Sequence, residues 1–261
     1  MQKIAVAISS ALIAFASCAP GKMAVSDSLK QNQDEYTVSG RQGILINQKM
    51  NFGEFHTTSI KRSWTRGGNY GWAIGTMGRT AEDFEQMIAM EYTKKKQTIS
   101  FELSDGKNST IANCISRYNA KDLVLGNPNS IWSIGIDLLN ISGKPQDTYY
   151  VQILTKDADH PWEMLIDNEA AQVKRKTYTG LLSFSKEKYY TIVPMTQLEK
   201  NGKVGTVLGS IGFEFRDKQG KAVAAVSLID KGMVFLGKTT PEERLLLANA
   251  CTALLLQEAI G

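Results

Sequence analysis

The residues on which enzyme chemistry most often depends are scarce in this sequence. Its 261 residues include two histidines, His56 and His160, and three cysteines, Cys18, Cys114 and Cys251. A Ser-His-Asp triad or a multi-histidine zinc site would need one or both of these histidines. The sequence also lacks a Gly-x-Ser-x-Gly motif, a phosphate-binding loop and a Cys-x-x-Cys pair. These absences favour a non-catalytic protein without a cofactor.

Strong charge and long apolar runs are scarce as well. The chain has 30 lysines and arginines against 26 acidic residues, a formal net charge of +4. This weak bias gives no support to a nucleic-acid partner. The apolar run at residues 4–16 is shorter than the roughly 20 residues that a membrane-spanning helix needs. We therefore predict neither nucleic-acid binding nor a membrane-spanning helix.

The first 18 residues nevertheless have a clear pattern. Lys3 precedes the apolar run, and the small residue Ser17 and then Cys18 follow it, as in a secretory signal peptide. The exit segment Phe15-Ala16-Ser17-Cys18 resembles the lipobox of bacterial lipoproteins, with phenylalanine where leucine is commoner. The resemblance implies that residues 1–17 are removed and that Cys18 becomes a lipid-modified N-terminus, carrying acyl chains such as palmitate. It also implies a place in the cell envelope, at the outer membrane, with the membrane face left open.

The segment that follows is polar and has no hydrophobic period. Residues 18–35 read CAPGKMAVSDSLKQNQDE, a composition typical of a flexible linker. We therefore predict a tether from the lipid on Cys18, followed by a single β-rich domain over residues 36–261.

Short strand-like segments recur through that domain. They are rich in valine, isoleucine, threonine, tyrosine and phenylalanine, and turns with glycine, asparagine or proline separate them. No long helix lies between them, which favours antiparallel connections over βαβ units. The segments are 36–40, 43–47, 57–64, 97–103, 109–118, 130–139, 148–155, 177–184, 188–194, 209–217 and 222–230.

The strongest helix signal lies near the C-terminus, at about residues 241–259. Thr240 is a suitable N-cap, and Pro241 suits the first helical position. Leucines occupy every side of this helix, because consecutive residues are about 100° apart around its axis. A helix without a polar face must be enclosed, and the available material is sheet.

We therefore predict a mainly β fold: an antiparallel barrel or strongly curved sheet that encloses the C-terminal helix. This architecture is similar to the tubby, scramblase and LURP-one barrels, in which many strands surround a hydrophobic C-terminal helix. The resemblance carries no family motif, so no functional residue follows from it. The alternative is a two-layer β-sandwich with the helix packed against it.

Two cysteines remain once Cys18 is assigned to the lipid. Cys114 and Cys251 would lie in a compartment where disulfides persist. The sequence leaves open whether they form a disulfide or are buried free thiols, because their separation is unknown.

One candidate ligand-binding surface consists of Trp64, Arg66, Tyr70 and Trp72, which lie in or beside a glycine-rich segment. Such planar groups can stack on sugar rings or apolar ligands. The alternative is that the two tryptophans point into the core, as aromatic strand residues usually do.

A second candidate consists of Asp157, Asp159 and His160, whose side chains could hold a metal ion or form an acid–base pair. A polar turn between strands explains the same residues. His56 lies in a strand-like stretch, and we expect it to be a half-buried strand residue without chemistry.

Three functions remain open. The first is a non-catalytic, lipid-anchored envelope protein that binds an unidentified ligand or protein partner. The second is an envelope hydrolase or metal-dependent enzyme that uses Asp157, Asp159 and His160. The third is a structural subunit of an envelope complex.

Overall fold

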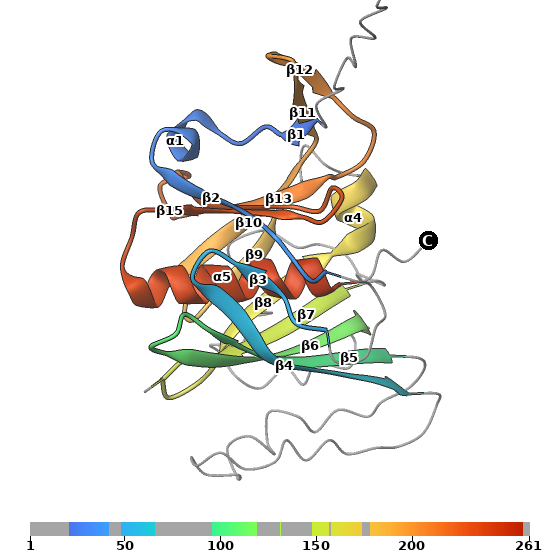
Figure 1. Ribbon diagram of the computed structural model, residues 1–261. Coiled ribbons are helices and arrows are strands. Elements are labelled where there is room, and N and C mark those ends of the chain that lie inside the picture. The colour runs from blue at the N-terminus through green and yellow to red at the C-terminus, as the bar shows by residue number, and fades with distance from the viewer. Residues whose placement is uncertain are drawn as a thin grey trace, which may run out of the picture.

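The computed structural model (Figure 1) describes residues 21–41, 48–65, 96–118, 131, 148–156, 158–173 and 178–257. Twelve strands form one antiparallel sheet in the order β2-β15-β14-β13-β10-β9-β8-β7-β6-β5-β4-β3. Their bounds are β2 Gln33–Thr37, β3 Asn51–Phe52, β4 Phe55–Thr65, β5 Lys96–Ser104, β6 Ser109–Tyr118, β7 Thr148–Leu154, β8 Trp162–Asp167, β9 Gly180–Ser183, β10 Tyr189–Met195, β13 Gly212–Arg216, β14 Ala222–Ser227 and β15 Met233–Gly237. The sheet curls into a nearly closed barrel, which confirms the predicted fold class.

The remaining described elements lie beside or inside the barrel. A small sheet in the order β1-β11-β12 stands at its side, at the top of Figure 1. These elements are β1 (Lys22–Met23), β11 (Gln197–Lys200), β12 (Lys203–Thr206), α1 (Asp27–Lys30), α4 (Asn168–Val173) and α5 (Pro241–Leu256). In the described part of the chain, no helix is both long and apolar enough to span a membrane.

Helix α5 fills the barrel interior (Figure 1). It packs against β5, β6 and β7 on one wall and against β14 and β15 on the other. Every residue from Leu245 to Leu256 is buried, as the absence of a polar face predicted. Each fully buried leucine contributes about 2 kcal/mol relative to an exposed one. The helix is therefore a main part of the hydrophobic core.

The two polar residues in the buried stretch of α5, Asn249 and Thr252, form hydrogen bonds inside the barrel. The Thr252 hydroxyl donates to the carbonyl of Ala248 (2.8 Å), and the Asn249 amide donates to the carbonyl of Leu245 (3.0 Å) and to the Thr110 hydroxyl on β6. A hydrogen bond back to the preceding helical turn lets these side chains lie in an apolar interior.

Arginines bind the free carbonyls at the C-terminal end of α5. Arg41 Nε donates to the carbonyl of Leu255 (3.0 Å), and Arg62 Nη2 donates to the carbonyl of Leu256 (3.3 Å). Cations are favourable at this end of a helix, because the unpaired carbonyls carry partial negative charge.

The barrel closes at a seam between its two edge strands, β2 and β3. The backbone of Ser39 exchanges two hydrogen bonds with the backbone of Asn51, at 2.9 and 3.1 Å. Arg244, in the first turn of α5, joins both sides of this seam. Its guanidinium contacts Asp34 (3.0 Å) and the Tyr36 hydroxyl (2.9 Å), both on β2, and Glu54 (2.9 Å) in the β3–β4 turn.

The prediction of a flexible tether over residues 18–35 is corrected for the described residues. Strand β1 pairs with β11, and Met23 and Leu29 are buried against the barrel. The Ser26 backbone N–H and hydroxyl both donate to the buried carboxylate of Glu214, at 2.9 and 2.7 Å. Two buried apolar side chains and two hydrogen bonds to Glu214 hold this segment, although its composition is that of a linker, so residues 21–35 belong to the folded domain.

Cys114 on β6 and Cys251 on α5 are buried free thiols, one of the two alternatives that the sequence left open. Burial raises the pKa of Cys114 to about 12 and also raises the pKa of Cys251. Both side chains are therefore protonated, apolar members of the core. His56 is half-buried on β4, where its residue pairs with Ser104 of β5, as expected of a strand residue.

We predict that Leu254→Asp abolishes folding, because a carboxylate would be enclosed by the barrel without a partner. The cost of burying such a charge is comparable to the roughly 5–15 kcal/mol that stabilises a typical domain. Thermal unfolding followed by circular dichroism should show no cooperative transition. The control Val173→Asp, at an exposed position on α4, should unfold like the wild type. A cooperative melt of Leu254→Asp near the wild-type temperature would contradict the enclosed helix.

A second prediction concerns the seam at low pH. Burial acts to raise the pKa of Glu54, but hydrogen bonds from Arg244 and Tyr36 outweigh it and hold this pKa below its ordinary value. A carboxyl with a lowered pKa stabilises the fold above its ordinary pKa and loses that contribution as the pH falls through the folded-state pKa. Between about pH 5 and pH 3, the free energy of unfolding should therefore fall less steeply in Glu54→Gln than in the wild type.

Urea titrations at each pH measure this slope. In the Arg244→Met background, Glu54→Gln should leave the pH dependence of the free energy of unfolding almost unchanged. The guanidinium that lowers the pKa of Glu54 is absent from this background. An equal effect of Glu54→Gln in both backgrounds would mean that Arg244 does not set the pKa of Glu54.

Candidate functional site

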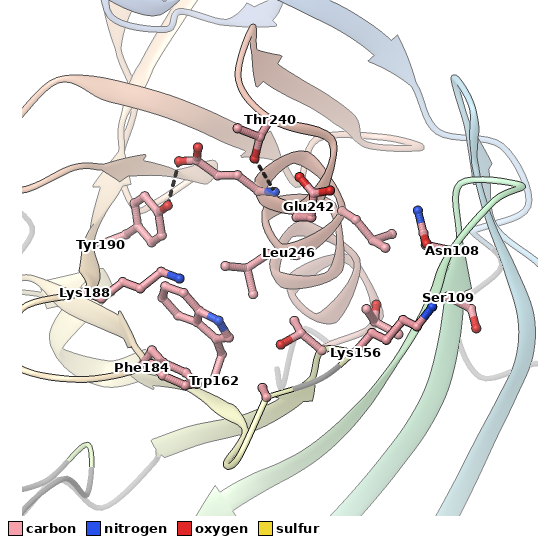
Figure 2. A pocket seen from close by; sticks show the side chains of 15 residues that line it. Asn108, Ser109, Lys156, Trp162, Phe184, Lys188, Tyr190, Thr240, Glu242 and Leu246 are labelled. Atoms are coloured by element: carbon pink, nitrogen blue, oxygen red, sulfur yellow. Dashed lines mark hydrogen bonds between the residues drawn. The ribbon is translucent and has the colours of Figure 1, made fainter.

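A cleft of about 680 Å³ opens at the barrel end where α5 begins (Figure 2). We call it the barrel-mouth cleft. Five segments line it: the β5–β6 turn, the loop after β7, the start of β8, the β9–β10 turn and the first turns of α5. Its lining residues are Asn108, Ser109, Thr110, Thr155, Lys156, Ala158, Trp162, Phe184, Lys188, Tyr190, Thr240, Glu242, Glu243, Leu245 and Leu246.

The floor of the cleft is apolar and comes from the helix. Leu245 and Leu246 form the first leucine turn of α5 after its capped start. The Thr240 hydroxyl caps the helix by accepting a hydrogen bond from the Glu243 backbone N–H at 3.3 Å. The helix thus fills the barrel interior, and the cleft lies above its first turn.

One wall of the cleft is aromatic (Figure 2). The rings of Trp162 and Tyr190 are stacked, with centroids 5.7 Å apart and planes at 26°. The ring of Phe184 lies 5.6 Å from that of Trp162 and 3.8 Å from that of His160. Trp162 is only 4% exposed, so Phe184 and Tyr190, which are half-buried, offer the more accessible ring surface.

The β9–β10 turn holds a lysine over this wall. The Ser185 hydroxyl accepts hydrogen bonds from the backbone N–H groups of Glu187 and Lys188, which fixes a tight polar turn. Lys188 Nζ lies 5.3 Å from the Trp162 ring centre and 5.6 Å from that of Phe184, at cation–π distance. Lys156, an exposed residue on the loop after β7, adds a second cation across the cleft.

Carboxylates lie where the helix begins. Glu243 accepts hydrogen bonds from the Tyr190 hydroxyl (2.6 Å) and from the Thr239 hydroxyl, whereas Glu242 is exposed at the rim. Burial, and then the neighbouring Glu243 carboxylate, raise the pKa of Tyr190. The Tyr190 hydroxyl therefore stays protonated and donates to Glu243, which fixes the aromatic wall relative to α5.

The loop predicted as a metal or acid–base site forms part of the lip of this cleft. Ala158 lines the cleft, Asp159 is exposed, and the His160 ring packs on Phe184. Asp157 lies outside the described residues, so the three-residue site stays a prediction. Among the residues that the structure describes, no group of three or more histidine, cysteine, aspartate or glutamate side chains is placed to hold a metal ion.

The first candidate surface also stays a prediction. The backbone of Trp64 pairs with Gln97 in the β4–β5 ladder, whereas Arg66, Tyr70 and Trp72 lie outside the described residues, as does Cys18. The barrel-mouth cleft is a different site, which sequence reasoning missed. Its residues lie in predicted strands, in turns, in the loop around His160 and at the helix start, and nothing in the pattern shows that these segments meet.

Comparison of the chain with protein-family models, with curated proteins and with solved structures finds no match. The function must therefore be argued from the site itself.

We predict that the cleft binds an aromatic anion such as 8-anilinonaphthalene-1-sulfonate, whose rings suit the aromatic wall and whose sulfonate suits Lys188. Replacing this cation by a carboxylate in Lys188→Glu should weaken binding by about tenfold or more. Fluorescence titration of the folded protein measures the affinity.

The matched control is Lys218→Glu, because Lys218 also lies over an aromatic ring, that of Tyr189 (5.6 Å), but is not part of the cleft. This variant should bind the probe like the wild type. An equal loss of affinity in both variants would mean that the probe responds to overall charge and not to the cleft.

Proposed function

We propose that this chain is a non-catalytic binding protein of the bacterial cell envelope, anchored by a lipid on Cys18, which binds its ligand in the barrel-mouth cleft. The observation that carries the proposal is that α5 fills the barrel interior while its first turn, an aromatic wall and two lysines frame an open cleft at the mouth. A barrel filled by leucines leaves no central space for a ligand, so recognition belongs at this end.

The lining indicates the kind of ligand. Phe184 and Tyr190 suit a flat apolar group, and Lys156 and Lys188 suit an acidic group close to it. The Glu242 carboxylate at the rim accepts hydrogen bonds from hydroxyl or amino groups. We therefore infer a small amphipathic ligand that combines a ring system with an acidic substituent.

The lack of a reactive constellation in the cleft supports binding over catalysis. None of its described lining residues is a histidine or a cysteine, so the lining holds no nucleophile–histidine pair. The hydrolase that the sequence left open would use His160, whose ring packs on Phe184 beside the cleft. The two functions therefore make different predictions for His160→Ala.

The test begins with protein purified under native conditions from the membranes of a bacterial host. Mass spectrometry of the denatured sample should show both an acylated Cys18 and a released small molecule. The molecule should remain with the wild type and with Lys218→Glu, and it should be lost from Phe184→Ala and Lys188→Glu, which remove the ring and the cation that hold it.

Retention of the molecule by the two cleft variants would overturn the cleft as the binding site. An unmodified Cys18 would overturn the anchor without affecting the cleft. Incubation of the released molecule with fresh protein separates binding from hydrolysis: we expect no conversion, whereas conversion that stops in His160→Ala would establish the enzyme.

A further inference from the structure

The β11–β12 hairpin exposes apolar side chains that no part of the described structure covers. In the part of the chain that the structure describes, three large hydrophobic side chains are exposed: Val173 (73%), Val204 (56%) and Leu208 (94%). Val204 lies on β12, and Leu208 lies in the loop that follows it. Every residue of β12 is exposed, so neither face of this strand packs on the barrel.

These three side chains belong to one side of the molecule. The carbonyl oxygen of the Gln172 side chain accepts a hydrogen bond from the Ser210 backbone N–H at 2.9 Å. This bond ties the end of α4, where Val173 lies, to the loop that carries Leu208. Figure 1 shows the same arrangement, with α4 beneath the chain that leads away from β12.

The turn of the hairpin carries two lysines. Lys200 and Lys203 flank the turn of the hairpin, and neither forms an ion pair with a described residue. The nearby acidic groups are already paired, Glu35 with Lys22 (2.7 Å) and Glu199 with Lys30 (3.1 Å). We call Val173, Lys200, Lys203, Val204 and Leu208 the hairpin surface. Exposed apolar side chains beside unpaired lysines suit an anionic lipid surface.

The proposed anchor brings this surface to the membrane. Strand β1 begins at Lys22, only four residues after Cys18, and pairs with β11, the first strand of the hairpin. Four residues of extended chain reach at most about 14 Å. A lipid on Cys18 would therefore hold the hairpin within about that distance of the bilayer. Residues 21–35 are folded onto the barrel, so they cannot extend to lengthen this connection.

We propose that the hairpin surface docks onto the anionic headgroups of the membrane that holds the Cys18 lipid, with Leu208 and Val204 among the headgroups and Lys200 and Lys203 against the lipid phosphates. This inference rests on the proposed lipid anchor. The hairpin rises from the side of the barrel (Figure 1), whereas the barrel-mouth cleft is lined by the first turns of α5. Docking in this orientation leaves the cleft open to solvent.

The test uses the whole mature chain, residues 18–261, with Cys18→Ser and an N-terminal histidine tag that binds nickel-chelating lipid. The vesicles contain phosphatidylethanolamine and phosphatidylglycerol. Leu208→Cys accepts an environment-sensitive fluorophore, while the buried Cys114 and Cys251 stay unlabelled. The control carries the same fluorophore on Lys107→Cys, at an exposed position of the β5–β6 turn. Lipids with a spin label near the headgroup should quench the fluorophore at position 208 severalfold more than the fluorophore at position 107.

Replacing Lys200 and Lys203 by glutamine should lower the ratio of docked to undocked protein by about fivefold for each lysine. Equal quenching at positions 107 and 208, or a fluorophore at 208 that stays in water, would overturn the proposal. The tag replaces the acyl chain, so this outcome does not depend on whether Cys18 is acylated. Binding of the aromatic sulfonate by the same variants in the absence of vesicles reports the cleft separately.

Discussion

Burial of the leucine-rich helix α5 is the interaction on which the rest of this structure depends. A helix with leucines on every side is stable only where no side meets water, and twelve strands curl around it to supply that environment. The same packing determines where a ligand can bind. Protein interiors are close-packed, and leucines fill this one. A ligand therefore has space to bind at the barrel mouth or on the outer surface and not at the centre of the barrel.

The two ends of α5 are polar, and each has its own role in the barrel. At the C-terminal end, Arg41 and Arg62 bind carbonyls that would otherwise be unpaired. At the N-terminal end, Arg244 joins both edges of the barrel seam, while Glu243 fixes Tyr190 in the cleft wall. Two neighbouring residues in the first turn of α5 thus have separate roles: Arg244 links the edges of the barrel, and Glu243 positions a side chain of the candidate binding site.

Much of the fold could be predicted from local patterns, whereas the site could not. Most of the described strands, the cap at Thr240 and the enclosed helix follow from polarity and propensity within short windows, whereas the barrel strands β8 and β15 were not predicted. The barrel-mouth cleft brings together Phe184, Trp162 and Glu243 from three separate segments, and no local pattern shows that these segments meet. Sequence reasoning missed the folded state of residues 21–35 for a related reason. The average composition of this segment is that of a linker, but buried Met23 and Leu29 and the hydrogen bonds of Ser26 hold it on the barrel.

By itself, the sequence determined that the chain must build a β-rich enclosure around its C-terminal helix, because the period and polarity of neighbouring residues fix which surfaces avoid water. It also shows that histidine and cysteine, on which much catalytic and metal chemistry depends, are scarce. Only the tertiary structure decided which strand edges meet at the seam, which side chains frame the cleft and that β1 pairs with β11 of the hairpin. Those features depend on contacts between residues far apart in the chain, and local sequence patterns carry no record of such contacts.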